Sequence, residues 1–216
     1  MLVIHGYPAG SGIAIGRAHL IRRNTSEVPQ ISLAECDIPA EAARFETAVK
    51  TTRKQLEHIR SNIPENAPTE LGAFISLHLM LLTDATLSRE PIDIIEEQQI
   101  NAEWALKIQT ERLAQQFDEI DDEYLRQRKQ DMLQVVERIQ KNLIGQSTEL
   151  NLEGALLDAI ILIAHDLSAA DTIHFKDQRI EGFVTDMGGP TSHTAILGRS
   201  LNIPSVIGLG AARRLI

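Results

Sequence analysis

The sequence predicts a mixed α and β fold, in which an antiparallel helical bundle is inserted into a discontinuous α/β domain. Three patterns predict it: β-branched runs broken by glycine fill the first 22 residues, helical periodicity fills residues 34–146, and strands alternate with helices from about residue 150. A chain of 216 residues has room for one or two domains. We therefore expect an α/β domain formed by residues 1–22 and 150–216, and a helical subdomain formed by residues 34–146.

The first segment, MLVIHGYPAGSGIAIGRAHLIRR, is expected to form two strands joined by a glycine-rich loop. Its short apolar runs contain β-branched residues and are interrupted by Gly6, Pro8, Gly10 and Gly12. Glycine and proline mark turns, whereas β-branched residues favour strands.

The middle of the chain is expected to form helices that each bury one face. Thr69 opens a helix, residues 88–99 form a short helix with Pro91 in its first turn, Asn101 caps another helix, and the last helix stops at Gly145. Such faces bury one another most readily in an antiparallel bundle. The first helix is predicted by residues at steps of three and four: Phe45, Val49, Thr52, Leu56, Ile59 and Ile63.

The last third of the chain returns to alternating strands and helices. The buried runs DAIILIA, IEGFVTD and PSVIGL predict strands, and SAADTIHF and TSHTAILGRSLN predict helices. Ser168 and Asp171 have the spacing of a capping box at the start of the first of these helices.

Composition excludes several classes of function. The chain has 30 acidic residues against 21 Lys plus Arg, so its net charge of −9 disfavours nucleic acid and favours a basic protein partner. One cysteine allows no intrachain disulfide, and the amino terminus lacks the pattern of a signal peptide. No apolar run approaches the roughly 20 residues that cross a bilayer. We expect a cytoplasmic protein with no membrane insertion.

One histidine stands where a helix is expected to begin, in GGPTSHTAIL. His193 falls in the first helical turn, where free backbone N–H groups and the helix dipole can hold a phosphoryl group. A neutral imidazole is a suitable nucleophile for phosphorus, and histidine supplies it near neutral pH. The residues that could hold the phosphoryl group are Gly188, Gly189, Thr191, Ser192 and Thr194.

The residues alone fit a second interpretation equally well, in which the two glycines form a tight turn and Ser192 caps a helix beside an incidental histidine. A serine hydrolase is disfavoured, because Ser192 lacks a G-x-S-x-G elbow and no acid follows His193. The other histidines show no H-x-x-x-H spacing, so no metal site is expected.

The segment GGPTSHTAILGRSLNIPSVIGLG resembles the phosphohistidine motif of phosphoenolpyruvate-utilising enzymes. Nearly the whole chain is similar to the amino-terminal half of enzyme I of the sugar phosphotransferase system, which is a phosphoenolpyruvate-protein phosphotransferase. The likeness extends to GYPAGSGIAIGRAHLI, LHLMLLTD, IDDEYL and ILIAHDLSAADT. The resemblance implies that the α/β domain is a phosphohistidine (swivelling) domain and that the inserted bundle binds the carrier protein HPr.

The resemblance also implies residue roles. His193 would take the phosphoryl group of phosphoenolpyruvate and pass it to HPr, with Nε2 as the expected site, and Thr172 would hydrogen-bond the unphosphorylated imidazole. Thr172 could instead be an ordinary helix hydroxyl, although this is the less favoured interpretation. His78 could equally be a half-buried helix histidine, and Met80 or Leu81 a core residue. The positions that match the HPr-facing surface are Glu70, His78, Met80, Leu81, Asp84 and, more weakly, Arg128.

The chain departs from the family pattern at several positions. Pro190 replaces an arginine often found in GGRTSH, and Gly198 stands where alanine is usual, which is expected to alter loop stiffness and leave the chemistry intact. Thr83, Ala85 and Thr86 dilute an acidic patch beside Asp84, which puts the strength of docking in doubt.

Family members continue into a phosphoenolpyruvate-binding barrel that dimerises and uses Mg²⁺. This chain stops at Ile216, before the last strands expected of the α/β domain, so we expect a fragment with no bound metal. Two rival functions are the swivelling domain of a phosphoenolpyruvate synthase or pyruvate phosphate dikinase, and a non-catalytic interaction module. LHLMLLTD argues against the first and an intact His193 against the second. The sequence does not distinguish a sugar-system carrier from a nitrogen-system carrier.

Overall fold

The computed structural model describes residues 3–21, 28–63, 65, 67, 69–121, 123–146, 159–172, 175, 180–190 and 192–210, with the backbone alone for 123–127. Contacts divide the chain into an α/β unit, Met1–Thr25, Asn62–Phe74 and Glu149–Ile216, and a helical unit, Ser26–Ser61 and Ile75–Thr148. The sequence pattern assigned all of residues 34–146 to the helical subdomain. The contacts differ at one place, because Asn62–Phe74 groups with the α/β unit.

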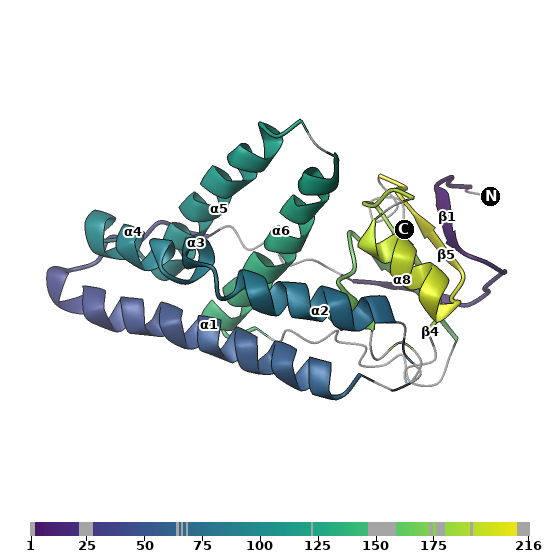
Figure 1. Ribbon diagram of the computed structural model, residues 1–216, viewed down its shortest axis with the longest axis horizontal. Coiled ribbons are helices and arrows are strands. Elements are labelled where there is room, and N and C mark those ends of the chain that lie inside the picture. Colours follow the sequence, from purple (N-terminus) through teal and green to yellow (C-terminus); the bar gives the residue numbers. More distant parts are fainter. Residues whose placement is uncertain are drawn as a thin grey trace. The chain divides into compact units, whose positions relative to one another are not determined.

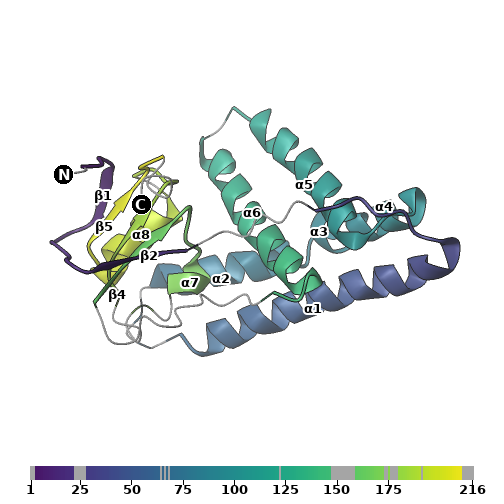
Figure 2. The same cartoon turned by 180° about the vertical axis from the view of Figure 1, so that it is seen from behind.

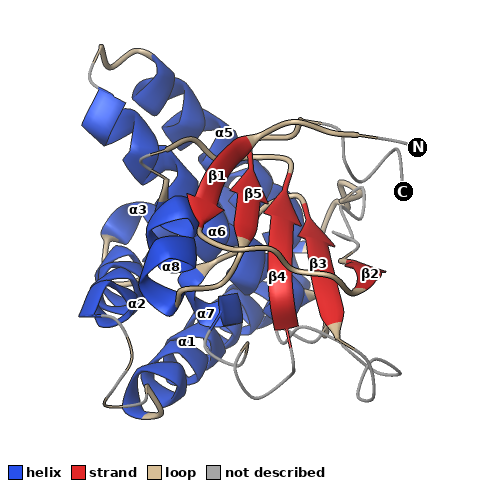
Figure 3. Cartoon of the chain, turned by 90° about the vertical axis from the view of Figure 1, so that its right-hand side faces the viewer, coloured by secondary structure: helices blue, strands red, loops and turns tan. Residues whose placement is uncertain are grey.

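A five-stranded mixed sheet forms the centre of the α/β unit (Figure 3). Its strands lie in the order β1-β5-β4-β3-β2, with β1 antiparallel to β5 and the other neighbours parallel. The strands are β1 (Tyr7–Gly10), β2 (Arg17–Leu20), β3 (Ile160–Ala164), β4 (Ile180–Thr185) and β5 (Ser205–Ile207). The expected strand regions are therefore all present, and the segments before and after the bundle join one sheet.

Two helices of the α/β unit follow β3 and β4: α7 (Ala169–Thr172) and α8 (His193–Leu201). Helix α8 packs against β1, β5 and α7. The expected helix over residues 168–175 is shorter, and its residues 173 and 174 lie outside the described part of the chain. The core beneath α8 contains Leu162, Phe175, Phe183, Ala195 and Ile207.

The helical unit contains α1 (Ile38–Ser61), preceded by a 3₁₀ turn at Glu35–Asp37. Helices α5 and α6 pack against each other and against α1, and α4 packs against α1 and α5 (Figures 1 and 2). Helix α2 (Thr69–Leu81) is divided between the two units after Phe74. The remaining helices of the helical unit are α3 (Ala85–Ser88), α4 (Glu90–Gln98), α5 (Ala102–Asp118) and α6 (Glu123–Leu143). None of the described helices is both long and apolar enough to cross a membrane by itself. The segments Thr69–Leu81 and Ala85–Gln98 reach the necessary length and apolar composition only when taken together, and they are bent by 66° relative to each other.

The short helix expected over residues 88–99 is wrong at its amino-terminal end. Asp84 caps a separate helix, α3, by accepting a hydrogen bond from the backbone N–H of Thr86 at 2.9 Å. Helix α4 then begins at Glu90, with Pro91 in its first turn. Proline fits there because the first helical N–H groups have no intrahelical acceptor.

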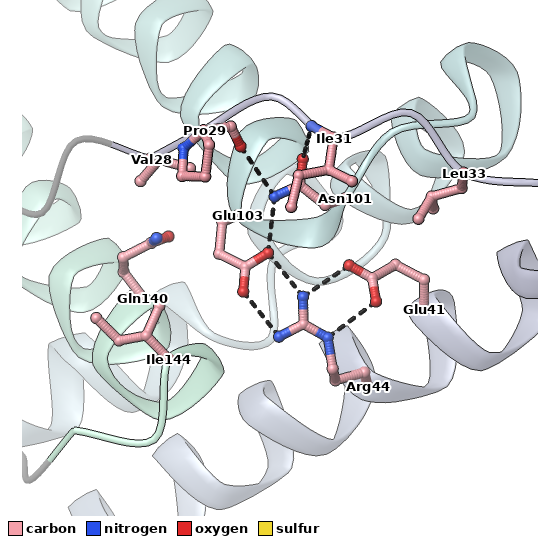
Figure 4. Close-up of a pocket in the computed structure, with 10 residues that line it drawn as sticks. All are labelled: Val28, Pro29, Ile31, Leu33, Glu41, Arg44, Asn101, Glu103, Gln140 and Ile144. Carbon is pink, nitrogen blue, oxygen red and sulfur yellow. Dashed lines mark hydrogen bonds and ion pairs between the residues drawn. The ribbon is translucent and has the colours of Figure 1, made fainter.

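Arg44 is the centre of a polar cluster that ties three helices of the helical unit together (Figure 4). Its Nε and Nη2 donate to Glu41 at 2.9 and 2.6 Å, and its Nη1 and Nη2 donate to Glu103 at 2.8 and 2.6 Å. Nη1 also donates to the carbonyl of Leu143 at 3.0 Å, at the end of α6. All five guanidinium N–H groups therefore have an acceptor.

The cluster borders a cavity of about 350 Å³ that is lined by apolar and polar side chains in equal number (Figure 4). Asn101 stands at the cap position of α5, but its side chain accepts no hydrogen bond from a backbone N–H of that helix. Its Oδ1 accepts from the N–H of Ile31 at 2.9 Å, and its Nδ2 donates to the carbonyl of Pro29 and to Glu103. The N–H of Ala102 donates to Glu41 instead, so the expected cap by Asn101 is wrong in its bonding.

The cluster also shifts the ionisation of its members. Hydrogen bonds from Arg44 lower the pKa of Glu41 below its ordinary 4.5. Burial raises the pKa of Glu103, but hydrogen bonds from Arg44, its own backbone N–H and Asn101 outweigh this, so the net shift is again downward. Both acids raise the pKa of Arg44. Stability from the carboxylates is therefore present above about pH 4.5 and is lost as the pH falls through their lower folded pKa values.

Arg44→Met is expected to lower the free energy of unfolding of the helical unit at pH 7. The further decrease on acidification should be smaller in the variant than in wild type. The cost should be roughly 2 kcal/mol, below the value for a fully buried pair, because the Arg44 side chain is 39% exposed. Lys50→Met, which removes an exposed pair with Glu46 on the same helix, should cost under about 0.5 kcal/mol. Urea unfolding between pH 3 and 7 measures both, and equal stability of the two variants would contradict the role of Arg44.

Gly198 in α8 has no room for a side chain. A Cβ there would collide with Ser205 Oγ and approach Phe183 to 3.2 Å. Ser205 Oγ is buried and has no hydrogen-bond partner among the described residues, so it occupies space and forms no bond. Glycine replaces the usual alanine here because the neighbouring Ser205 leaves no space for a methyl group. The replacement therefore affects the packing of α8, whereas the sequence suggested an effect on loop stiffness.

Gly198→Ala is expected to lower the free energy of unfolding by up to about 2 kcal/mol, because overpacking outweighs the better helix propensity of alanine. Adding Ser205→Ala removes the collision and should restore the wild-type value, while Ser205→Ala alone should change little. Urea unfolding of wild type, the two single variants and the double variant gives the double-mutant cycle that measures the coupling between the two positions. The packing explanation fails if Gly198→Ala is as stable as wild type or if the double variant is no better than the single one.

Candidate functional site

His193 is the first residue of α8, as expected from the sequence. Ser192 caps the helix: its backbone is extended, and its Oγ accepts from the N–H of Ala195 at 3.3 Å. The first turn of a helix carries N–H groups with no intrahelical acceptor, and they lie at the positive end of the helix dipole. The backbone around His193 therefore favours a bound anion.

The sheet brings α8 to the edge where polar residues gather. Strands β3 and β4 are parallel, so their carboxyl ends share one edge, and His165, Asp166 and Asp186 follow directly after them. His165 Nδ1 lies 3.9 Å from Asp186 Oδ2. Ligands of parallel sheets bind at this edge. The sequence reading missed Asp186, although a carboxylate directly after a buried strand was a usable signal.

The two glycines before His193 have different roles. Gly188 has φ +109°, and a Cβ there would approach Ser192 Oγ to 3.1 Å, so the turn requires glycine. A Cβ at Gly189 would meet nothing within 4 Å, and its carbonyl accepts from the N–H of Ser192 at 2.9 Å. Gly189 leaves the main chain open at the start of α8. Arg199 Nη2 donates to the carbonyl of Pro190 at 3.1 Å and fastens the loop to the end of the helix.

The hydroxyl groups that were expected to hold a phosphoryl group lie in different environments in the structure. Thr194 is buried, and its one hydroxyl proton is shared between Asp166 Oδ1 at 3.1 Å and the carbonyl of Leu167 at 3.3 Å. Its proton is therefore already used, and Thr194 anchors the start of α8 instead of facing a ligand. Ser192 Oγ accepts in its cap bond, which leaves its proton for another acceptor. Thr191 lies outside the described residues.

Thr172 ends α7 and is buried. Its Oγ1 donates to the carbonyl of Ala169 at 2.9 Å. The expected capping box at the start of α7 is confirmed: the N–H of Ser168 donates to Asp171 Oδ2 at 2.8 Å, and the N–H of Asp171 donates to Ser168 Oγ at 3.3 Å. Since α7 packs against α8, the box fixes the helix that carries Thr172 beside the one that carries His193.

Phe74 on α2 contacts His193, and nothing in the sequence reading pointed to it. The two ring centroids are 4.0 Å apart, and the ring planes meet at 66°. Both side chains are half-buried. The contact joins residues 119 positions apart, so local patterning could not have found it.

The residues expected to face HPr lie in different environments. Glu70 is exposed in the first turn of α2, Met80 is 61% exposed in its last turn, and Leu81 is half-buried. Asp84 is exposed but also caps α3.

His78 differs from the expectation because it is only 3% exposed and does not face solvent. Its Nε2 lies 3.9 Å from Oδ1 of the buried Asp131, whose Oδ2 lies 3.4 Å from Nη1 of the partly exposed Arg128.

Comparisons with known proteins give a consistent picture. The family model for the N-terminal part of PEP-utilising enzymes matches residues 5–128, and the model for their mobile domain matches residues 157–216. A phosphoenolpyruvate-protein phosphotransferase of Cupriavidus necator is 44% identical over 220 residues, covering 99% of this chain and 38% of that protein. One of the same name from Bacillus subtilis is 32% identical, covering 98% of this chain and 36% of that protein.

Solved structures agree. A solution structure of Enzyme I superimposes with a TM-score of 0.76 at 33% identity, covering 99% of this chain and 86% of that one. The N-terminal domain of Enzyme 1 - Nitrogen gives a TM-score of 0.64 at 28% identity, covering 95% of this chain and 83% of that one. The resemblance and the fold class expected from the sequence are confirmed. The chain spans less than two fifths of the length of the curated relatives named above.

Proposed function

The chain belongs to the family of PEP-utilising enzymes, and we propose that it carries a phosphoryl group on His193 from phosphoenolpyruvate to the carrier protein HPr. The observation that supports this most strongly is the position of His193 at the first residue of a capped helix, at the carboxyl edge of the sheet. That segment lies within the match to the mobile domain of the family.

The transfer is a displacement at phosphorus. The lone pair of the His193 Nε2 forms the new P–N bond while the bond from phosphorus to the donor breaks, and the donor keeps that electron pair. With phosphorylated HPr as donor, the leaving group is the carrier's own imidazole, so the reaction runs in either direction. Backbone N–H groups of the first turn of α8 and the hydroxyl of Ser192 stabilise the anionic product.

Thr172 fixes the tautomer in this proposal. Because its hydroxyl proton is donated to Ala169, the oxygen can only accept from the imidazole. An imidazole that donates from Nδ1 to Thr172 carries its lone pair on Nε2, where the phosphoryl group is received. The contact between Thr172 and His193 is carried over from the family resemblance, and with it Nε2 is the nitrogen left to react.

HPr docks on the exposed part of α2 and the residues that follow it. A chain with a net charge of −9 suits a carrier with basic residues around its histidine. Exposed Glu70 supplies charge, exposed Met80 supplies apolar surface, and Asp84 contributes at the cap of α3. Leu81 and Arg128 are partly exposed and complete the list of contacts, whereas buried His78 supports the surface from inside.

As the resemblance implies, we assign phosphoenolpyruvate binding and dimerisation to a barrel domain outside the part of the relatives that this chain matches. Phosphoenolpyruvate enzymes of this type use Mg²⁺ to neutralise substrate charge. Within the described residues, no three His, Cys, Asp or Glu side chains are grouped to hold a metal ion. These residues do not form a Mg²⁺ site, so we derive no step through the ion. We place the full-length protein in the cytoplasm, in sugar transport.

The rival assignments are less well supported. A swivelling domain of a phosphoenolpyruvate synthase or dikinase would also match the mobile-domain family, but the relatives that cover 98–99% of this chain are named as protein phosphotransferases. A non-catalytic module would not need His193 at a capped helix start. Side-by-side assays with sugar-system and nitrogen-system carriers decide which HPr is the partner.

Phosphorylated HPr should transfer one phosphoryl group to the 216-residue chain, and His193→Gln should abolish this uptake because it removes the nucleophile. Glutamine keeps much of the side-chain volume, so circular dichroism and HPr binding should barely change. Phosphoenolpyruvate and Mg²⁺ alone should give no labelling. The phosphorylation in each of these incubations is measured by intact-mass spectrometry under alkaline conditions, which preserve phosphohistidine.

Three outcomes would contradict this prediction. Retained labelling of His193→Gln would move the acceptor to another residue, and absence of labelling in wild type would remove the proposed activity. Labelling by phosphoenolpyruvate without carrier would show that this chain itself binds that substrate.

Glu70→Lys is expected to weaken HPr binding roughly tenfold at low salt and to flatten its salt dependence, because it replaces an attractive charge by a repulsive one. Glu97→Lys changes the net charge equally at an exposed position of α4 and should leave affinity nearly unchanged. Calorimetric titration at several salt concentrations compares them. Equal weakening by both variants would indicate a general charge effect and not a dock near Glu70.

A further inference from the structure

The backbone on both sides of His193 is fixed, but the direction of its imidazole depends on two side-chain torsions. Ser192 is held by its cap bond to Ala195, and Thr194 by its bond to Asp166. These bonds fix the peptide and do not reach the imidazole ring. Contacts made by the ring itself therefore decide where the imidazole points.

Phe74 supplies a wall against which that ring rests. Its phenyl ring and the imidazole have centroids 4.0 Å apart, closer than the roughly 4.5–7 Å of ordinary aromatic pairs. The planes are inclined by 66°, so the edge of one ring meets the face of the other. In this arrangement the imidazole cannot rotate freely about its χ2 torsion without meeting the phenyl group.

Burial of the α2 core does not explain a phenyl group at this position. The fully buried apolar residues on that helix are Leu71 and Ile75, one turn apart, and they carry its inward face. Phe74 is half-buried beside them. Its contact with His193 is therefore a separate feature of the helix surface.

We propose that Phe74 is a positioning residue for phosphoryl transfer, which holds the His193 imidazole so that its reacting nitrogen points at the incoming phosphorus. This inference rests on the function proposed above. The face of a phenyl ring is electronegative and does not bind a phosphoryl group. We therefore expect the phosphoryl group to lie on the side of the imidazole away from Phe74.

The size of the effect follows from the strength of an aromatic contact. A pair worth about 0.5–1.5 kcal/mol corresponds to roughly a 2- to 13-fold change in the fraction of correctly oriented imidazole. Correct alignment of nucleophile and phosphorus matters in the transfer step and not in carrier docking. Loss of Phe74 should therefore lower the maximal rate and leave the affinity for HPr unchanged.

The test compares Phe74→Ala and Phe74→Leu with wild type and with Phe117→Ala, which removes a half-buried phenyl group from α5. Single-turnover uptake from saturating phosphorylated HPr should slow roughly 2- to 13-fold in Phe74→Ala, less in Phe74→Leu, and not in Phe117→Ala. Calorimetry should give the same HPr affinity for all. The proton signals of the His193 ring, shifted by the phenyl ring current in wild type, should move in both Phe74 variants.

The outcomes separate this inference from the proposed function. Wild-type labelling with an unchanged rate in Phe74→Ala would overturn the positioning role and leave the function intact. A loss confined to HPr affinity would also overturn it, because Phe74 would then belong to the dock. Absence of wild-type labelling would overturn the function and the inference together. If Phe74→Ala unfolds, the partial rate loss in folded Phe74→Leu decides the question.

Discussion

Backbone N–H groups at the start of a helix lack backbone acceptors within the helix, and His193 is the first residue of α8. The same groups that favour an anion there would stabilise the phosphorylated imidazole, since phosphorylation adds negative charge at that place. A histidine elsewhere on a helix would have to expose its phosphoryl group to solvent. The capped start of α8 therefore links a local sequence pattern to a reaction.

The rest of the α/β unit places that helix start. The parallel strands bring the loops after β3 and β4 to one edge, and the loop after β3 anchors Thr194 through Asp166. At the other end, Gly198 lets α8 approach Ser205 of β5 closely. In the helical unit, the bonds from Arg44 of α1 to Glu103 and to the carbonyl of Leu143 perform a comparable task, because they hold the start of α5 and the end of α6 against α1.

Patterns local in sequence predicted most of the fold. Alternation and glycine turns identified the strands, and the Ser192 cap with the apolar spacing of α8 identified His193 as the first-turn residue. Features set by distant partners were not predictable. Asn101 has the chemistry of a cap, yet it bonds the chain near Ile31, because Glu41 from another helix takes the Ala102 N–H. Thr194 and Phe74 acquire their roles through contacts that no spacing in the sequence encodes.

A comparison of the amide signals of the unphosphorylated and phosphorylated chain tests most directly whether the helix start holds the phosphoryl group. With phosphorylated HPr as donor, the largest changes in the nitrogen–proton spectrum should fall on Gly189, His193 and Thr194, as their N–H groups meet the phosphoryl oxygens. Large changes centred on another histidine, or unchanged signals at the start of α8 in a fully phosphorylated chain, would contradict the assignment.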